Sequence, residues 1–216
     1  MPRKPPIVIR WEGLAFGATS YDVPLWVNPN RRSGRWNIAG RGCTQYFSLD
    51  AEAPYAELLR SEDLRTEREA QTYFAVLWQV RVDDGAVVDY STFEKAEAAG
   101  FPAEALVDDD HERCQAEAAW LRSHNVRGVL SPCAALPEST NLTLFGPRTQ
   151  GAWDTNVKLA STLPTQRIAQ GHPPPALVSR TRFYGQTHAD LLEYRSGQGR
   201  LFEARPGRGT RPRRRS

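Results

Sequence analysis

The stretch "TYFAVLWQVRVD", residues 72–83, decides the fold because it is the clearest β-strand in the chain. Apolar residues occupy every second position from Phe74 to Val82, and this period of two predicts a strand with one buried face. The "DDG" that follows predicts a turn, and "GAVVDYS" at 85–91 predicts a partner strand across it. A β-sheet is therefore expected at the centre of the fold.

More strands and a helix are predicted on the N-terminal side of this stretch. "IVIRW" (7–11) has the composition of a strand, whereas the Gly, Pro and Asn residues of 12–34 predict a long loop. "TQYFSL" (44–49) predicts another strand. Asp50 then predicts the N-cap of a helix over 51–64, whose apolar residues share one face.

The C-terminal side contains the same mixture of elements. "DDDHERCQAEAAWLRSHN" (108–125) predicts a helix, because its apolar residues recur at helical spacing and its leading acids complement the helix dipole. "VRGVLSPCAAL" (126–136) and "NLTLFGP" (141–147) predict two strands joined by a polar turn. Strands and helices without a regular βαβ alternation indicate an α+β fold.

The charge of the chain is unevenly distributed. The 216 residues carry a net charge of +3, but the last twelve hold six of the 28 basic residues and none of the 25 acidic ones, so the remainder carries −3. This tail, 205–216, has no apolar residue to bury and is expected to be disordered, with weak, non-specific phosphate binding as the functional alternative. Residues 1–204 are expected to form a single domain, which has no basic stripe for nucleic acid.

The cysteine and histidine residues do not predict a disulfide scaffold or a metal site. The three cysteines have no CxxC spacing, and the four histidines are scattered. We therefore expect no metal, and a reducing, cytoplasmic location. No stretch approaches the length needed to cross a bilayer. The segments "GRGCTQ" and "GQGR" lack the third glycine of a dinucleotide-binding fingerprint, and no phosphate-binding P-loop or GxSxG elbow is present.

Three residues with chemical potential lie eleven positions apart: Arg35, Tyr46 and Glu57. Arg35 lies in a glycine-flanked loop, Tyr46 in the next strand and Glu57 in the next helix, and such a unit can place all three around one opening. A guanidinium binds phosphate in a bidentate manner, an aromatic ring packs on another ring, and a carboxylate stabilises a ribosyl cation. The alternatives are a surface arginine, a core tyrosine and a solvated glutamate.

The surrounding motif resembles the RES domain, and in particular its actinobacterial branch. The run "GRWN…G…QYFSL…PYAELL" contains Gly34 to Asn37, Gly40, Tyr46 and Glu57 in the family's order. A second block, "SPCAALPESTNLTLF", begins at Ser131 and matches the family's Pro-Ser-Ala followed by an Asn and an apolar strand. The resemblance covers residues 7–150 best.

This resemblance implies an ADP-ribosyltransferase-like fold, with a mixed, mainly antiparallel sheet flanked by helices. It implies a toxin of a toxin–antitoxin pair that cleaves the nicotinamide–ribose bond of NAD, with NAD as substrate and no cofactor. It also implies an Xre-type antitoxin that would supply any specific DNA binding, and an oligomer or toxin–antitoxin complex. The acceptor stays open between water, phosphate and a protein side chain.

The resemblance also implies roles for individual residues. Arg35 would bind the NAD phosphates, and Tyr46 would position the nicotinamide end. Glu57 would stabilise the ribosyl cation or orient its attacker. Asn37 and Asn141 would add polar contacts to the dinucleotide.

One position departs from the family pattern, because Cys133 stands where the family has Ser. A thiol is a weak hydrogen-bond donor, so we expect slower turnover and count Cys133 among the catalytic positions. Ser131, with the same side-chain parity, is a candidate substitute. Two alternatives follow from this departure: a covalent cysteine nucleophile, and an attenuated domain that binds NAD, ADP-ribose or a protein partner without efficient turnover.

Overall fold

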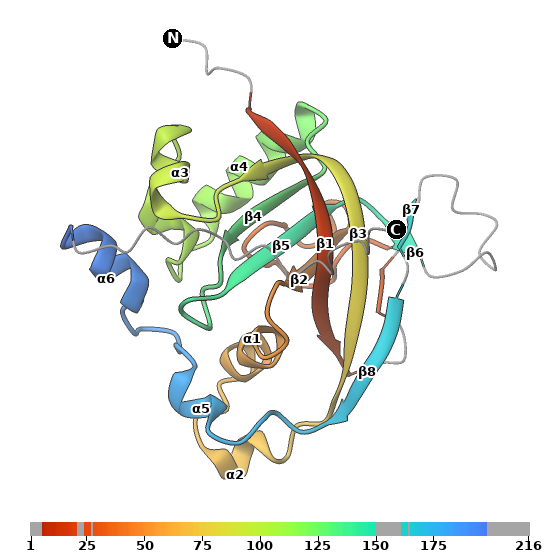
Figure 1. The fold of residues 1–216 in the computed structure, drawn as a ribbon, viewed down its shortest axis with the longest axis vertical. Helices are drawn as coiled ribbons and strands as arrows, with labels where there is room; N and C mark the ends of the chain where they lie inside the picture. Colours follow the sequence, from red (N-terminus) through yellow and green to blue (C-terminus); the bar gives the residue numbers. More distant parts are fainter. Residues whose placement is uncertain (1–5, 21–23, 27, 150–160, 164, 198–216) are drawn as a thin grey trace, which may run out of the picture.

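The computed structural model describes residues 6–20, 24–26, 28–149, 161–163 and 165–197, and the predicted tail lies outside these ranges. A curved sheet forms the centre of the molecule, and helices cover it on one side and at one end (Figure 1). The strands of the main sheet are β1 (Val8–Thr19), β2 (Thr44–Ser48), β3 (Ala75–Asp89), β4 (Gly128–Pro132), β5 (Thr140–Phe145) and β8 (Thr165–Gly171). Two further strands, β6 (Arg148–Thr149) and β7 (Ser161–Thr162), form a small parallel pair.

The main sheet has the order β1-β2-β5-β4-β3-β8, and β1 also pairs with β3. Five of its strands therefore close into a ring. The β3–β4 pair is parallel, whereas the other pairs of this sheet are antiparallel. The expected α+β fold with a mixed, mainly antiparallel sheet is confirmed.

The helices are short and lie between or after the strands (Figure 1). They are α1 (Ala53–Ser61), α2 (Glu67–Ala70), α3 (Phe93–Ala98), the 3-10 turn η1 (Ala103–Leu106), α4 (Glu112–Ser123), α5 (Leu177–Arg180) and α6 (Ala189–Arg195). None of the helices in the described part of the chain is long and apolar enough to span a bilayer.

The predicted hairpin at "DDG" is wrong, because residues 75–89 form one continuous strand, β3. Strand β1 pairs with it from Val8, opposite Val88, to Thr19, opposite Val76. The register shifts once, between Ile9 and Trp11, and this irregularity accommodates one extra residue of β3 near Ala86, whose φ is 59°. A long neighbouring strand thus overrides a local turn signal.

The predicted loop over 12–34 is wrong in its first part, because β1 continues to Thr19. The glycines that indicated a loop are sites of close packing by aromatic rings. A Cβ atom at Gly13 would lie 2.9 Å from the Trp11 ring, and one at Gly17 would lie 3.3 Å from the Phe47 ring. Glycine within a strand marks such close approaches as well as turns.

Helix α1 is confirmed, but Asp50 is not its N-cap. The N-cap is Glu52, which makes no side-chain capping bond, and Pro54 lies in the first turn. The Asp50 carboxylate instead accepts a hydrogen bond from the Glu52 amide at 2.7 Å. Proline favours the first turn of a helix, and the helix therefore starts two residues later than predicted.

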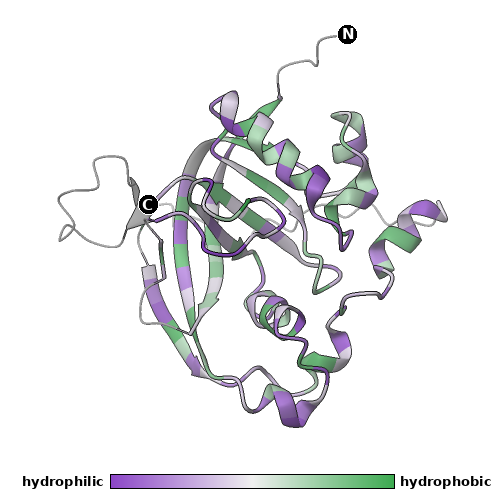
Figure 2. Cartoon of the chain, turned by 180° about the vertical axis from the view of Figure 1, so that it is seen from behind, coloured by the Kyte–Doolittle hydropathy of each residue, from purple (hydrophilic) through white to green (hydrophobic). Residues whose placement is uncertain are grey.

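The core consists of three clusters that meet at the sheet. One fills the ring of strands and includes Ala15, Val80, Val82 and Leu142. A second lies between α1, α5 and the sheet, and a third lies under α3, η1 and α4. Phe74, expected on the buried face, precedes β3 and is half exposed. In Figure 2 the central strands are largely hydrophobic, whereas hydrophilic residues gather on α2.

Candidate functional site

The Gly34–Asn37 loop is held in place by the Tyr46 side chain. The Tyr46 hydroxyl accepts a hydrogen bond from the Trp36 amide at 2.9 Å and donates one to Asn37 Oδ1 at 2.8 Å. Asn37 Nδ2 in turn donates to the Arg32 carbonyl at 2.9 Å. Trp36 is buried beside Phe101, so it anchors the loop in the core. The loop that carries Arg35 therefore has a defined shape.

Tyr46 presents its ring to solvent and its oxygen to the loop. The side chain is 40% exposed on the outward face of β2, yet burial of the hydroxyl raises the pKa of Tyr46 above its usual range. The phenol therefore stays protonated and keeps both of its loop contacts at neutral pH. The packing of the Tyr46 ring against another ring stays a prediction.

Gly34 allows the close approach of Tyr46. A Cβ atom at this position would lie 2.8 Å from the Tyr46 oxygen and 2.9 Å from Asn37 Oδ1. We expect Gly34→Ala to break these hydrogen bonds and to reduce any activity that depends on Arg35 by about tenfold or more. The matched control is Gly171→Ala, because a Cβ atom at Gly171 meets open space and the φ of this residue is not positive. Gly100→Ala would be a poor control, because the φ of Gly100 is 78°. Turnover equal to wild type in Gly34→Ala would show that the loop shape is unimportant.

Arg35 extends from this loop towards η1 and α4. Its Nη1 donates to the Ala105 carbonyl at 3.1 Å, and the Cys114 thiol donates to the same carbonyl at 3.0 Å. Gln115 Nε2 donates to the Gly34 carbonyl at 3.0 Å. The first turn of α4 thus fixes the base of the loop, and the half-exposed Arg35 guanidinium keeps donors that can bind a ligand.

Glu57 on α1 is held by residues from β4 and β5. Its Oε1 accepts hydrogen bonds from Asn141 Nδ2 at 2.9 Å and from the Cys133 thiol at 3.2 Å. Asn141 Oδ1 accepts from Ser48 Oγ at 2.6 Å, at the end of β2. Oε1 alone carries these bonds, so the carboxylate is oriented while its second oxygen has no hydrogen bond to a described residue.

The Cys133 thiol is a hydrogen-bond donor in this network. The side chain is fully buried, and burial together with the Glu57 charge raises the pKa of Cys133 well above its usual value. A protonated, inaccessible thiol is a poor nucleophile, which argues against covalent chemistry at Cys133. Ser131 is also buried, opposite Asn141 in the sheet, and the described hydrogen bonds do not join it to Glu57.

The predicted residues face one region of the molecule. The charges of Arg35 and Glu57 both act on the Tyr46 hydroxyl, and both act on the imidazole of His111. Cys133 and Asn141 each donate a hydrogen bond to Glu57, and Tyr46 donates one to Asn37. The structure thus brings together all six residues that the sequence indicated.

Comparisons with known proteins agree with this arrangement. The family model described as "RES domain" matches residues 8–170. The chain belongs to the RES domain family. Among solved structures, it resembles the MbcT toxin in the M. tuberculosis MbcT–MbcA toxin–antitoxin complex, with a TM-score of 0.58 and 24% sequence identity over 80% of this chain and 90% of that one. No curated protein matches the chain.

Four further residues of this RES domain lie near the site, and none of them belongs to the motifs that indicated the other site residues. Arg60 is buried, and its guanidinium donates to Asp109 Oδ1 at 2.6 Å and to the Ala134 carbonyl at 2.5 Å. Arg182 donates to the same Asp109 oxygen at 2.9 Å, and the Gly185 amide donates to Oδ2 at 2.6 Å. His111 follows Asp109 by two positions. Two features of the sequence could have indicated these residues. Arg60 lies one helical turn after Glu57, and acidic residues precede His111 in "DDDH".

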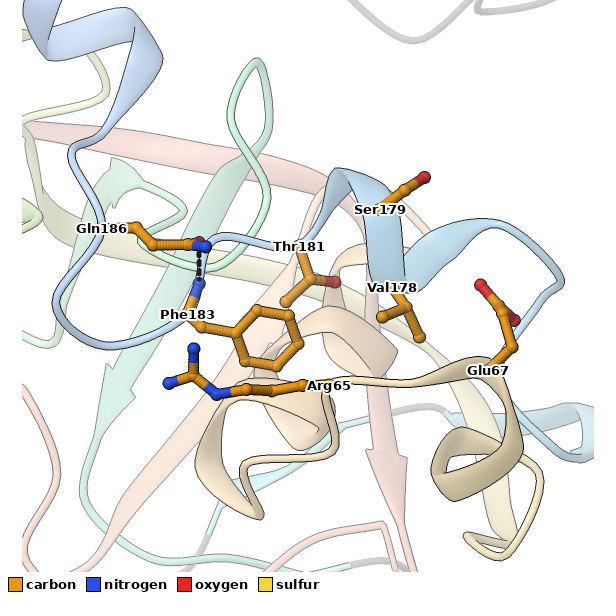
Figure 3. Close-up of a pocket in the computed structure, with 7 residues that line it drawn as sticks. All are labelled: Arg65, Glu67, Val178, Ser179, Thr181, Phe183 and Gln186. Atoms are coloured by element: carbon orange, nitrogen blue, oxygen red, sulfur yellow. Dashed lines mark hydrogen bonds between the residues drawn. The ribbon is translucent and has the colours of Figure 1, made fainter.

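A cavity of about 520 Å³ lies between the α1–α2 connection and α5 (Figure 3). Seven residues line it, namely Arg65, Glu67, Val178, Ser179, Thr181, Phe183 and Gln186. The Arg65 guanidinium lies 5.0 Å from the centre of the Phe183 ring. None of the residues predicted for catalysis lines this cavity, so its size does not identify it as the active site of the RES domain.

Proposed function

We propose that this RES domain cleaves the nicotinamide–ribose bond of NAD. The observation that carries the proposal is the Glu57 carboxylate, fixed through Oε1 by Asn141 and Cys133 and left open at Oε2. A carboxylate oriented in this way stabilises positive charge on a ribose as its glycosidic bond breaks, without having to reorganise. Arg35, which faces the same region, supplies a cation for the diphosphate of the same molecule.

The remaining residues would bind and orient the dinucleotide. The exposed ring of Tyr46 would pack against the nicotinamide end, and Asn37 would support this contact through the Tyr46 hydroxyl. Asn141 would both hold Glu57 and offer a polar contact to the substrate. Nicotinamide leaves with the bonding electron pair, and an acceptor adds to the ribosyl cation. A water acceptor releases one proton and gives ADP-ribose.

The direct test is mass spectrometry of NAD incubated with the purified protein, with and without inorganic phosphate. We expect loss of NAD and release of nicotinamide, with ADP-ribose or its phosphorylated form as the second product. ADP-ribose attached to the protein or to an added protein would instead identify an ADP-ribosyltransferase. Intact NAD after long incubation, with saturable binding, would overturn the proposal in favour of a binding domain.

We also propose that the protein acts as the toxin of a toxin–antitoxin pair. The support is its fold, which is similar to that of MbcT in a toxin–antitoxin complex. Expression in a bacterial cytoplasm is expected to arrest growth as NAD falls, and a cognate antitoxin, expected to be of the Xre type, is expected to restore growth. Unchanged growth despite measurable NAD loss would remove the toxin role and leave the enzymatic one.

The second candidate function is an attenuated domain that retains a ligand or a protein partner. It is favoured by one observation: the thiol of Cys133 donates to Glu57 where a serine hydroxyl would donate more strongly.

Replacing Cys133 by Ser tests this candidate, and we expect kcat to rise by about tenfold, because a stronger donor to Oε1 fixes the carboxylate more firmly. Turnover numbers for wild type and variant provide the measurement, and Cys43→Ser, which changes a cysteine far from Glu57, is the matched control. Equal turnover in wild type and Cys133→Ser would show that the thiol does not slow the reaction.

A further inference from the structure

The first turn of α4 lies directly against the loop that carries Arg35. Cys114 and Arg35 donate to the same Ala105 carbonyl, and Gln115 donates to the Gly34 carbonyl. His111 is the N-cap of this helix, three positions before Cys114 and four positions before Gln115. Residues at this spacing share a helix face, so His111 lies on the side of α4 that faces the Arg35 loop.

On its other side, His111 is next to a charged cluster that includes two buried arginines. Asp109, two residues earlier, accepts hydrogen bonds from Arg60 on α1 and from Arg182 on the C-terminal segment. Arg60 is 2% exposed, and Tyr184 covers its guanidinium at 4.4 Å. The charges of Arg35 and Arg60 both act on His111, so the ring lies near the Arg35 loop and near the Arg60–Asp109 pair.

The imidazole of His111 is half-buried and has no hydrogen bond to any residue in the described ranges. Burial, followed by the charges of Arg35 and Arg60, lowers the pKa of His111 to about 4, and Glu57 and Asp109 offset part of this shift. The two cations and two carboxylates balance in charge, and Asp108, Asp110 and Glu112 are further acids close to His111 in the sequence. Burial is therefore the main reason that the ring is neutral at pH 7.

We propose that His111 is a ligand-contacting residue that takes up a proton when an anionic phosphate group binds at Arg35, and then becomes an additional cation of the site. This inference rests on the proposed function, because it takes the ligand to be a nucleoside diphosphate such as the ADP-ribose part of NAD. A diphosphate carries two negative charges, which favour the protonated form of a nearby imidazole. The proton taken up by His111 then offsets one of these charges.

The direction in which pH changes the affinity for the ligand follows from this proton uptake. An opposite charge at about 4–6 Å shifts a pKa by about 1–3 units towards the charged form, so the pKa of bound His111 rises towards 6. Protonated protein then binds the ligand more tightly. Affinity is expected to increase by about tenfold from pH 7 to pH 5 for a two-unit shift, because the diphosphate keeps its charge over this range.

The test is an NMR titration of the histidine rings of the full chain, with and without saturating ADP-ribose, which has no nicotinamide bond to cleave. His111→Gln identifies the resonance, and its side chain breaks no described contact. We expect the His111 transition to move from about pH 4 to about pH 6 when ADP-ribose binds. The dissociation constant of His111→Gln is expected to be independent of pH between 5 and 7.

The outcomes separate this inference from the proposed function. If wild type cleaves NAD and binds ADP-ribose while the His111 transition stays near pH 4, the role given to His111 is wrong and the proposed NAD cleavage is supported. If the His111 transition moves when ADP-ribose binds but NAD stays intact, anion binding near His111 is supported and the proposed NAD cleavage is wrong. If ADP-ribose does not bind at millimolar concentration and NAD is not cleaved, both are wrong.

Discussion

Replacing Glu57 by Gln is expected to reduce kcat for NAD cleavage by about 10²–10³-fold, the usual cost of removing one oriented electrostatic group. Glutamine retains the shape of the side chain, and its Oε1 can still accept from Asn141 and Cys133. The variant lacks the charge that offsets the ribosyl cation. Because that charge develops in the transition state, KM is expected to change little, and steady-state kinetics separate the two effects.

Glu62→Gln is the matched control for this substitution. Glu62 follows the last turn of α1, and its contact with Arg32, at 3.5 Å, is an exposed pair that contributes little. The control is expected to retain wild-type kcat and stability. Arg35→Ala is expected to raise KM strongly, because it removes the phosphate-binding cation. A Glu57→Gln protein as active as wild type would require another source of transition-state stabilisation.

The largest expected effect on stability belongs to Asp109→Ala, which removes the shared partner of Arg60 and Arg182. Both guanidinium groups are then buried without a carboxylate, and we expect a loss of about 3 kcal/mol in the free energy of unfolding. The matched control, Asp83→Ala, breaks an exposed pair with Arg10 and is expected to cost less than about 1 kcal/mol. Urea denaturation measures both. Equal stability of the two variants would contradict the role given to Asp109.

This contribution also has a defined pH dependence. Burial alone would raise the pKa of Asp109, but the Gly185 amide and the charges of Arg182 and Arg60 outweigh burial and lower it. A carboxyl whose pKa is lower in the folded state stabilises the fold fully above its unfolded pKa, about 3.9, and loses this effect as the pH falls through the folded value. The difference between wild type and Asp109→Ala is therefore constant from pH 7 to about pH 5 and narrows below about pH 4.

The sequence predicted the elements more reliably than their lengths. The alternation that begins at Val76 predicted a central strand, and the apolar spacing around Cys114 and Leu121 predicted α4. The limits of β1 and β3 depend on their mutual pairing over more than ten residues. Such pairing is a tertiary effect, and it overrides the local signals of Gly13, Gly17 and the "DDG" segment.

The site could be predicted only where one motif contained it. Arg35, Tyr46 and Glu57 lie within a short stretch, and Asn141 follows in a second block. Asp109, Arg182 and His111 are brought to the site by the packing of α4 and the C-terminal segment, and their spacing along the chain carries no signal of this contact. The hydrogen bond of Tyr46 to the Arg35 loop likewise depends on how β2 lies beneath that loop.

The three partners of Asp109 have a consequence for the boundaries of the protein. The match to the family model ends at residue 170, whereas Arg182 and Gly185 lie beyond it. A chain trimmed to the matched residues would keep the five-stranded ring but leave Arg60 with a carboxylate that has lost two of its three ligands. The segment that matches the family model therefore leaves out residues whose contacts hold the buried Arg60–Asp109 pair together.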